Sequence, residues 1–78
     1  MEAHCDESRS PVDRLTRRER EVLRRTALGQ TNAEIAAVLG VTIHAVKFHL
    51  GSIFRKLGVS NRTKATAIYV GYDHGTAE

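Results

Sequence analysis

Residues 31–58 read TNAEIAAVLGVTIHAVKFHLGSIFRKLG, and this segment predicts two helices separated by a very short turn. Thr31 opens the first helix with a capping box, and Gly40 supplies the left-handed residue that ends it. Thr42 follows almost at once and is the natural cap of a second helix over about residues 43–57. The first helix is expected to bury Ile35, Val38 and Leu39. Two helices joined by such a short turn are typical of a helix-turn-helix when the second helix has a polar outer face.

The second of these helices has an apolar face and a polar face. At about 100° per residue, the apolar side chains fall on one side of the helical wheel. They are Val46, Leu50, Ile53 and Leu57, with Ile43 and Phe54 beside them. The opposite side carries His44, Lys47, Phe48, Gly51 and Arg55, with Ser52 at its margin.

The charge of this region is one-sided, because no acidic residue occurs between Glu34 and Asp73 while several lysines and arginines do. An acid-free basic stretch inside a folded domain suits a surface that binds a polyanion. On charge alone, a solvated cationic face that aids solubility explains the stretch equally well.

Two further helices are predicted outside this segment. Thr16 begins another capping box, which opens a helix that Gly29 ends. The inward face of this helix is expected to consist of Val22, Leu23, Thr26 and Ala27. Ser60 or Asn61 caps a last helix, which Asp73-His74-Gly75 is expected to break. No segment alternates apolar and polar residues as a strand would, so the sequence predicts an all-α fold of four helices.

The chain has 78 residues, which is enough for one small domain with a modest core. Residues 1–13 are polar, hold the only proline and carry four acidic side chains, so we expect a flexible tail or linker remnant there. The folded domain is expected over residues 14–75, with the helix-turn-helix motif at about residues 31–50.

Several classes of protein are excluded by features that the sequence lacks. The single Cys5 cannot form an internal disulfide, which argues against a secreted, disulfide-stapled module. No apolar run approaches the ~18 residues of a membrane span and no signal peptide opens the chain, so a cytoplasmic location is expected. His44 and His49 miss the i, i+4 spacing of helical metal ligands, and no nucleophile or acid–base pair stands out. We therefore expect no metal, no cofactor and no enzymatic activity.

Nearly all of the folded sequence resembles one known family through an ordered series of short motifs. These motifs are LTRREREVL at residues 15–23, Gly29, NAEIA at 32–36, LGV at 39–41, VKFHL at 46–50, IFRKLGV at 53–59 and NRT at 61–63. Together they cover about residues 14–72 and resemble the LuxR/FixJ-type (NarL-like) DNA-binding domain of bacterial transcriptional regulators. The resemblance implies four helices, of which the third reads the major groove and the fourth commonly pairs two domains.

Double-stranded DNA is therefore the expected partner, and regulation of bacterial transcription the expected function. On the groove-facing helix, the residues expected to contact DNA are His44, Lys47, Phe48, Gly51 and Ser52. Lys47 can donate to guanine or only neutralise phosphate, and Phe48 can lie against a thymine methyl. Residues expected to hold the phosphate backbone are Arg55, Lys56, Asn61, Arg62, Thr63 and Lys64, with Thr31, Asn32 and Thr42 as further contacts.

Gly51 departs from the family pattern, which tends to have a polar or basic side chain at this position. Either contact with the bases is thinner here, or the backbone approaches the DNA closely at this turn.

The last helix is expected to pair two copies of the domain through Ala67, Val70 and His74, which lie opposite its core side. The expected assembly is a homodimer, strengthened on DNA, that occupies a partly palindromic site in the nucleoid, with RNA polymerase as a further partner. A second class stays open, namely a protein-interaction module whose basic helical face binds an acidic partner. A steep fall of affinity for random duplex DNA with rising salt would favour the first class.

Overall fold

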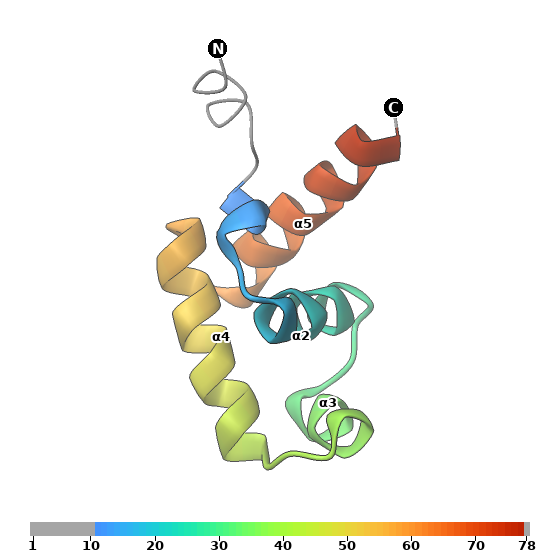
Figure 1. Ribbon diagram of the computed structural model, residues 1–78, viewed down its shortest axis with the longest axis vertical. Helices are drawn as coiled ribbons and strands as arrows, with labels where there is room; N and C mark the ends of the chain where they lie inside the picture. Colours follow the sequence, from blue (N-terminus) through green and yellow to red (C-terminus); the bar gives the residue numbers. More distant parts are fainter. Residues whose placement is uncertain (1–10, 78) are drawn as a thin grey trace.

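The computed structural model describes the backbone of residues 11–77 and the side chains of residues 11–72, and within that range it contains helices and no strands. A 3-10 helix comes first and four α-helices follow. In order, they are η1 (Pro11–Arg14), α2 (Arg17–Ala27), α3 (Asn32–Leu39), α4 (Ile43–Leu57) and α5 (Arg62–Ala77). In Figure 1, α2 lies in the middle, α4 runs along one side, α3 lies near one end of α4, and α5 leads away near the other. The predicted all-α fold of four helices is confirmed.

Each α-helix begins at a side chain that accepts backbone hydrogen bonds. Thr16 Oγ1 accepts the Glu19 N–H at 3.1 Å, and the Glu19 carboxylate accepts the Thr16 N–H at 2.9 Å, so the predicted capping box is formed. Thr31 forms the second box, with the equivalent distances of 3.1 and 2.8 Å. Thr42 accepts a first-turn N–H of α4 at 3.0 Å. Asn61 does the same for α5 at 2.9 Å, so Asn61 is the cap of that helix.

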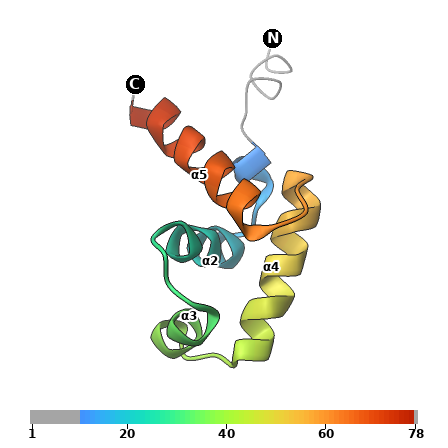
Figure 2. The ribbon, with the colours of Figure 1, turned by 180° about the vertical axis from the view of Figure 1, so that it is seen from behind.

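The turn between α3 and α4 is as short as predicted. Gly40 ends α3 with a φ of 72°, in the left-handed region that glycine adopts without a steric cost. Thr42 already caps α4, so the helix direction changes by 108° within a few residues. This angle lies in the range of about 90–120° that helix-turn-helix pairs adopt. Figure 2 shows the pair and its connection from behind.

The core lies where α2 packs against α3, α4 and α5. Its largest fully buried side chains are Leu23, Ile35, Ile53, Val12, Val22 and Val46, and Ala65 of α5 is buried with them. The four α4 residues predicted to face inward, Val46, Leu50, Ile53 and Leu57, are all buried. Because burial of this stripe fixes the rotation of α4 about its axis, it also fixes which face of α4 is left to solvent.

Two details of the helices differ from the prediction. Val38 is 54% exposed rather than buried. It lies about 60° from Ile35 on the helical wheel, on the side away from Leu39, so the core does not reach it. The backbone of α5 continues through Asp73-His74-Gly75 to Ala77. A single glycine inside a helix costs only about 1 kcal/mol, and no proline follows to stop the helix.

The amino-terminal boundary also differs, because the ordered chain begins before residue 14. Pro11–Arg14 forms η1, and the side chain of Val12 within it is completely buried in the core. The hydroxyl of Tyr72 donates to Asp13 Oδ1 at 3.2 Å, which joins this segment to α5. The rest of the predicted tail, residues 1–10, lies outside the described residues.

Candidate nucleic-acid interface

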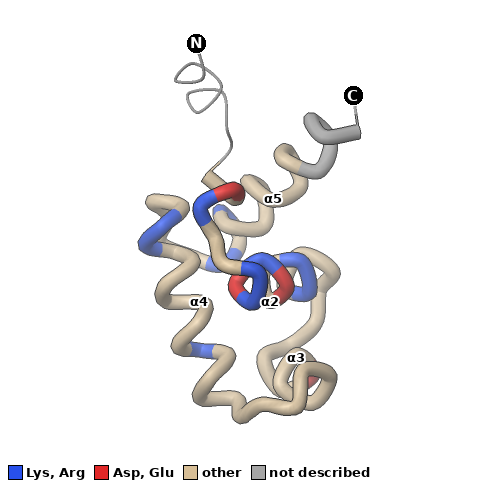
Figure 3. The backbone as a smooth tube through the Cα atoms, viewed as in Figure 1, with Lys and Arg blue, Asp and Glu red and all other residues tan. Residues whose placement is uncertain are grey.

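The face of α4 that points away from the core carries the residues predicted to enter the groove. His44 and Lys47 are exposed, and Phe48 is 69% exposed although it is aromatic. Gly51 is half-buried. Figure 3 shows only basic charge along α4, whereas α2 carries both signs. On a helix without acidic residues, an exposed aromatic ring can contact base edges, and the basic side chains beside it can contact bases and phosphates.

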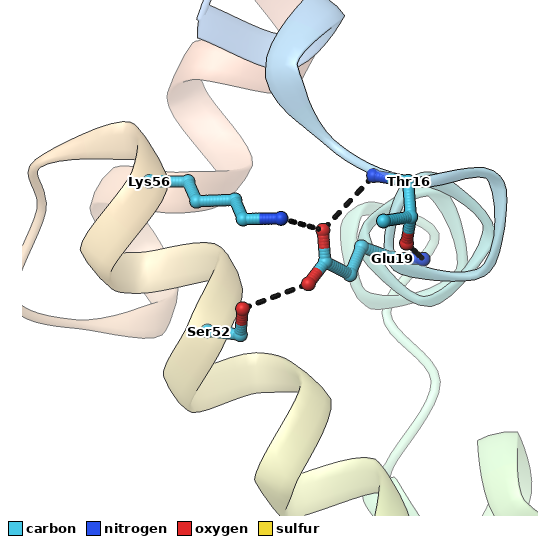
Figure 4. A network of polar contacts seen from close by, with 4 residues as sticks. All are labelled: Thr16, Glu19, Ser52 and Lys56. Carbon is cyan, nitrogen blue, oxygen red and sulfur yellow. Dashed lines mark hydrogen bonds and ion pairs between the residues drawn. The ribbon is translucent and has the colours of Figure 1, made fainter.

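Ser52 and Lys56, at the margin of this face, contact α2 (Figure 4). Ser52 Oγ donates to Glu19 Oε2 at 2.7 Å, and Lys56 Nζ donates to Glu19 Oε1 at 2.8 Å. Glu19 is 6% exposed. Since Glu19 also completes the capping box of α2, one carboxylate fastens the start of α2 to the second half of α4. Ser52 and Lys56 thus each donate a hydrogen bond to Glu19 within the domain.

The negative charge of Glu19 is stabilised by these partners. Burial alone would raise the pKa of its carboxyl group, but hydrogen bonds from Lys56, Thr16 and Ser52 more than offset this effect. Together with the positive charge of Lys56, they lower the pKa of Glu19 from 4.5 to about 2. The carboxylate is therefore ionised at neutral pH, and the contact between α2 and α4 is an ion pair.

Arg62, predicted to hold a phosphate, is half-buried and hydrogen-bonded to other parts of the domain. Its Nη1 donates to Asn32 Oδ1 at 3.0 Å, and its Nη2 donates to the backbone carbonyl of Gln30. The structure therefore brings two predicted phosphate contacts together by binding them to each other. One guanidinium joins the first turn of α5 to the start of α3 and to the loop before it.

The other predicted phosphate contacts are exposed, and they are Thr31, Thr42, Arg55, Asn61, Thr63 and Lys64. The side-chain oxygens of Thr31, Thr42 and Asn61 cap helices, as described above. Arg55 differs from them, because its side chain forms no hydrogen bond or ion pair with any of residues 11–72. The same holds for Lys47 and for Lys64 near the start of α5. These three side chains are the free cations on α4 and the first turn of α5 within the described part of the chain.

The residues predicted to pair two domains are only partly described. Ala67 is exposed and Val70 is 44% exposed, both on the outer side of α5. The backbone of His74 belongs to α5, but its side chain lies outside the described residues. The described part of the predicted contact is therefore accessible to a partner.

The role of Glu19 beyond capping was not predicted. A signal for it exists, because residues 19, 22, 23 and 26 share one helical face, and the last three were predicted to point inward. A carboxylate on a buried stripe needs a buried partner. That partner could not be identified by spacing along one helix, because Ser52 and Lys56 are 33 and 37 residues away.

The described residues contain neither a membrane-spanning single helix nor a cluster of metal-ligating side chains. No single helix there is long and apolar enough to cross a membrane, although α3 and α4 together, bent by 108°, meet the same criteria of length and composition. No group of three or more His, Cys, Asp or Glu side chains in this range could hold a metal ion.

Comparison with known proteins gives the family. Residues 13–69 match the model of bacterial regulatory proteins of the luxR family. The chain is 50% identical over 60 residues to the probable transcriptional regulatory protein SgaR of Hyphomicrobium methylovorum, covering 77% of this chain and 28% of that protein. It is 45% identical over 71 residues to the transcriptional regulatory protein LiaR of Bacillus subtilis, covering 91% and 33%. A third relative, the transcriptional activator protein ExpR of Dickeya dadantii, is 43% identical over 59 residues, which cover 76% and 24%.

The chain thus spans about a third or less of the length of these curated relatives. The match includes all of α2, α3 and α4 and half of α5, and it contains the face of α4 described above. The family is one of transcriptional regulators and not of enzymes. The chain therefore belongs to the luxR family of bacterial regulatory proteins and carries its helix-turn-helix DNA-binding domain.

Proposed function

We propose that this domain binds double-stranded DNA in a sequence-specific way, with α4 in the major groove, and so regulates transcription at a bacterial promoter. The observation that carries the proposal is the outer face of α4, which exposes Lys47 and Phe48 and contains no acidic residue. An α-helix about 10–12 Å across fits a major groove about 12 Å wide. In this arrangement α3, set at 108° to α4, crosses the phosphate backbone beside the groove. The nucleoid is then the place of action, and RNA polymerase is a further partner.

Lys47 is proposed to read sequence. It lies in the second turn of α4, exposed and without a partner among residues 11–72. Lysine can donate to the O6 and N7 atoms of guanine, whereas a phosphate contact carries no sequence information. Phe48 beside it can lie against a thymine methyl group.

We expect Lys47→Ala to weaken binding to the preferred site by about 1–3 kcal/mol more than binding to random duplex. Lys64→Ala is the matched control, because Lys64 is a predicted phosphate contact outside α4 and is likewise an exposed lysine without a side-chain partner among residues 11–72. It should weaken both kinds of binding alike and reduce the salt slope by about one ion. The measurement is affinity by fluorescence anisotropy at several salt concentrations. If both variants shift the two affinities equally, Lys47 contacts only phosphate, and Phe48 is the next candidate for reading sequence.

Selection from a random pool of duplexes, together with the same salt titration, separates sequence-specific DNA binding from the second class of function. A domain whose basic face serves an acidic protein partner would show no enrichment of any duplex from a random pool. A DNA-binding domain should enrich one family of duplexes and lose affinity steeply as salt rises.

We also propose that two domains pair through the outer side of α5 on a partly palindromic site. Val70 supports this, since it is 44% exposed on the side of α5 opposite the half-buried Ile68, Tyr69 and Tyr72. Val70→Asp should leave the domain folded and should abolish cooperative occupancy of paired half-sites, because two carboxylates would meet in an apolar contact. Helical content by circular dichroism is the control. A variant that keeps its helix content and still binds paired half-sites cooperatively would show that the dimer contact lies elsewhere.

A further inference from the structure

The outer face of α4 has a gap at Gly51. A Cβ added to this residue would meet nothing closer than Arg55 Nη1, at 3.8 Å. Gly51 does not have a positive φ, so its backbone conformation does not require glycine. Alanine would favour the helix, and the domain leaves room for it. Neither helix geometry nor crowding within the domain therefore explains the glycine.

The guanidinium of Arg55 lies beside this gap. Residues i and i+4 share a helix face, and long side chains on a helix point back toward its amino-terminus. Arg55 follows this rule, since its Nη1 lies 3.8 Å from the place where a Cβ of Gly51 would be. The positive end of Arg55 is thereby moved by about one turn, or about 5 Å, toward the half of α4 that carries Lys47 and Phe48.

Of the two basic side chains in the last turn of α4, Arg55 is the one without a partner among the described residues. Its neighbour Lys56 is paired with Glu19 at 2.8 Å. Arg55 is exposed, and its side chain has no hydrogen bond or ion pair with the described residues. Its position across the gap is thus not the result of an ion pair that draws it there.

We propose that Arg55, lying across Gly51, contacts a base edge in the major groove and helps to determine which DNA sequence the domain prefers. This inference rests on the proposed function. Arginine presents a planar fork of N–H donors that matches the O6 and N7 atoms of guanine. No side chain at position 51 separates this fork from the groove. Arg55 is a specificity-determining residue in this arrangement, and Gly51 is the residue that makes room for it.

The experiment uses the duplex selected from a random pool by the unaltered chain, and a shuffled duplex as the reference. Arg55→Lys keeps the charge but loses the fork, so the affinity for the selected duplex should fall about tenfold while that for the shuffled duplex changes little. A second selection with this variant should lose the preference for guanine at one position of the site. Arg18→Lys is the matched control, because Arg18 is an exposed arginine on α2, outside the outer face of α4, and its side chain has no hydrogen bond or ion pair with the described residues. It should keep both the affinity and the preference.

Gly51→Leu tests the arrangement itself, because the longer side chain fills the space that the Arg55 guanidinium occupies. It should cause the same loss of preference as Arg55→Lys, and the double variant should lose no more than either single variant. Losses that add would mean that the introduced side chain merely clashes with DNA, and they would overturn the inference. So would equal effects of Arg55→Lys on the two duplexes.

The outcome for Lys47→Ala distinguishes a failure of the inference about Arg55 from a failure of the proposed DNA-binding function. If Lys47→Ala reduces the preference and Arg55→Lys does not, the inference about Arg55 fails and the proposed function stands. If neither variant changes DNA binding, or if the selection enriches no duplex, both fail.

Discussion

Glu19→Gln should lower the free energy of unfolding at pH 7 by about 3–4 kcal/mol, which corresponds to the fall in the pKa of Glu19 from 4.5 to about 2 at about 1.4 kcal/mol per pH unit. Glutamine keeps the shape of the side chain and can still accept the Thr16 N–H in the capping box. The substitution therefore removes the charge of the α2–α4 contact and little else. The measurement is urea unfolding followed by circular dichroism at 222 nm.

The pH dependence gives an independent check. The pKa of Glu19 is lower in the folded chain, so its contribution to stability is fully present above about pH 4.5 and is lost as the pH falls toward 2. The difference between the unaltered chain and Glu19→Gln should thus be largest near neutral pH and shrink through this window. A difference that stays constant from pH 7 to pH 2.5 would show that the charge of Glu19 does not stabilise the fold.

Variants of the two α4 partners of Glu19 separate the hydrogen bond from Ser52 from the ion pair with Lys56. Lys56→Met removes the cation but keeps the stem packed, while Ser52→Ala removes a hydroxyl that donates at 2.7 Å. Lys56→Met should lose most of its effect in the Glu19→Gln background, because the two residues act as one pair. Independent, additive losses would contradict the ion pair as the source of the stability.

The starts of the α-helices could be predicted because they depend on chemistry within a few residues. A threonine at the first position and a glutamate three residues later satisfy backbone amides wherever they occur, and a threonine alone satisfies one, so Thr16, Thr31 and Thr42 identify three helix starts. The inward stripe of α4 could be predicted for a similar reason, since its apolar residues recur at helical spacing. The exposed residues His44, Lys47 and Phe48 then follow as the opposite face.

The partners of the polar residues could not be predicted, because they depend on how helices pack. In the sequence, Ser52 and Lys56 are polar residues at the edge of a basic face. Only the packing of α2 against α4 shows that Glu19 is their partner. Val38 was expected in the core because it is apolar, but a helix of eight residues with Ile35 and Leu39 on the inside leaves it exposed. Spacing along one helix gives a face, and only the arrangement of the helices decides which part of that face is covered.

The contacts of Arg62 also depend on how the helices pack. We expect Arg62→Ala to lower the free energy of unfolding by about 2–3 kcal/mol. The change removes two charge-assisted hydrogen bonds, one to the Asn32 side chain at 3.0 Å and one to the carbonyl of Gln30, in a half-buried place. Arg62→Lys keeps the charge, but a single ammonium group cannot reproduce the paired geometry of the guanidinium, so most of the loss should remain. Asn32→Ala, which removes only one acceptor, should cost less. Urea unfolding of the three variants measures these losses.

The DNA-binding behaviour of the Arg62 variants distinguishes a phosphate contact from a contact that positions α3. A side chain that neutralises a phosphate should be largely replaced by lysine, and its loss to alanine should reduce the salt slope by about one ion. A guanidinium that holds the start of α3 against α5 should fail equally with lysine and alanine and leave the slope unchanged, since Nη1 and Nη2 each donate a hydrogen bond within the domain. We expect the second pattern, with Lys64→Ala providing the one-ion fall for comparison. Arg62→Lys with normal stability and normal affinity would instead return Arg62 to the phosphate contacts, because the hydrogen bonds to Asn32 and Gln30 would then contribute little to the position of α3.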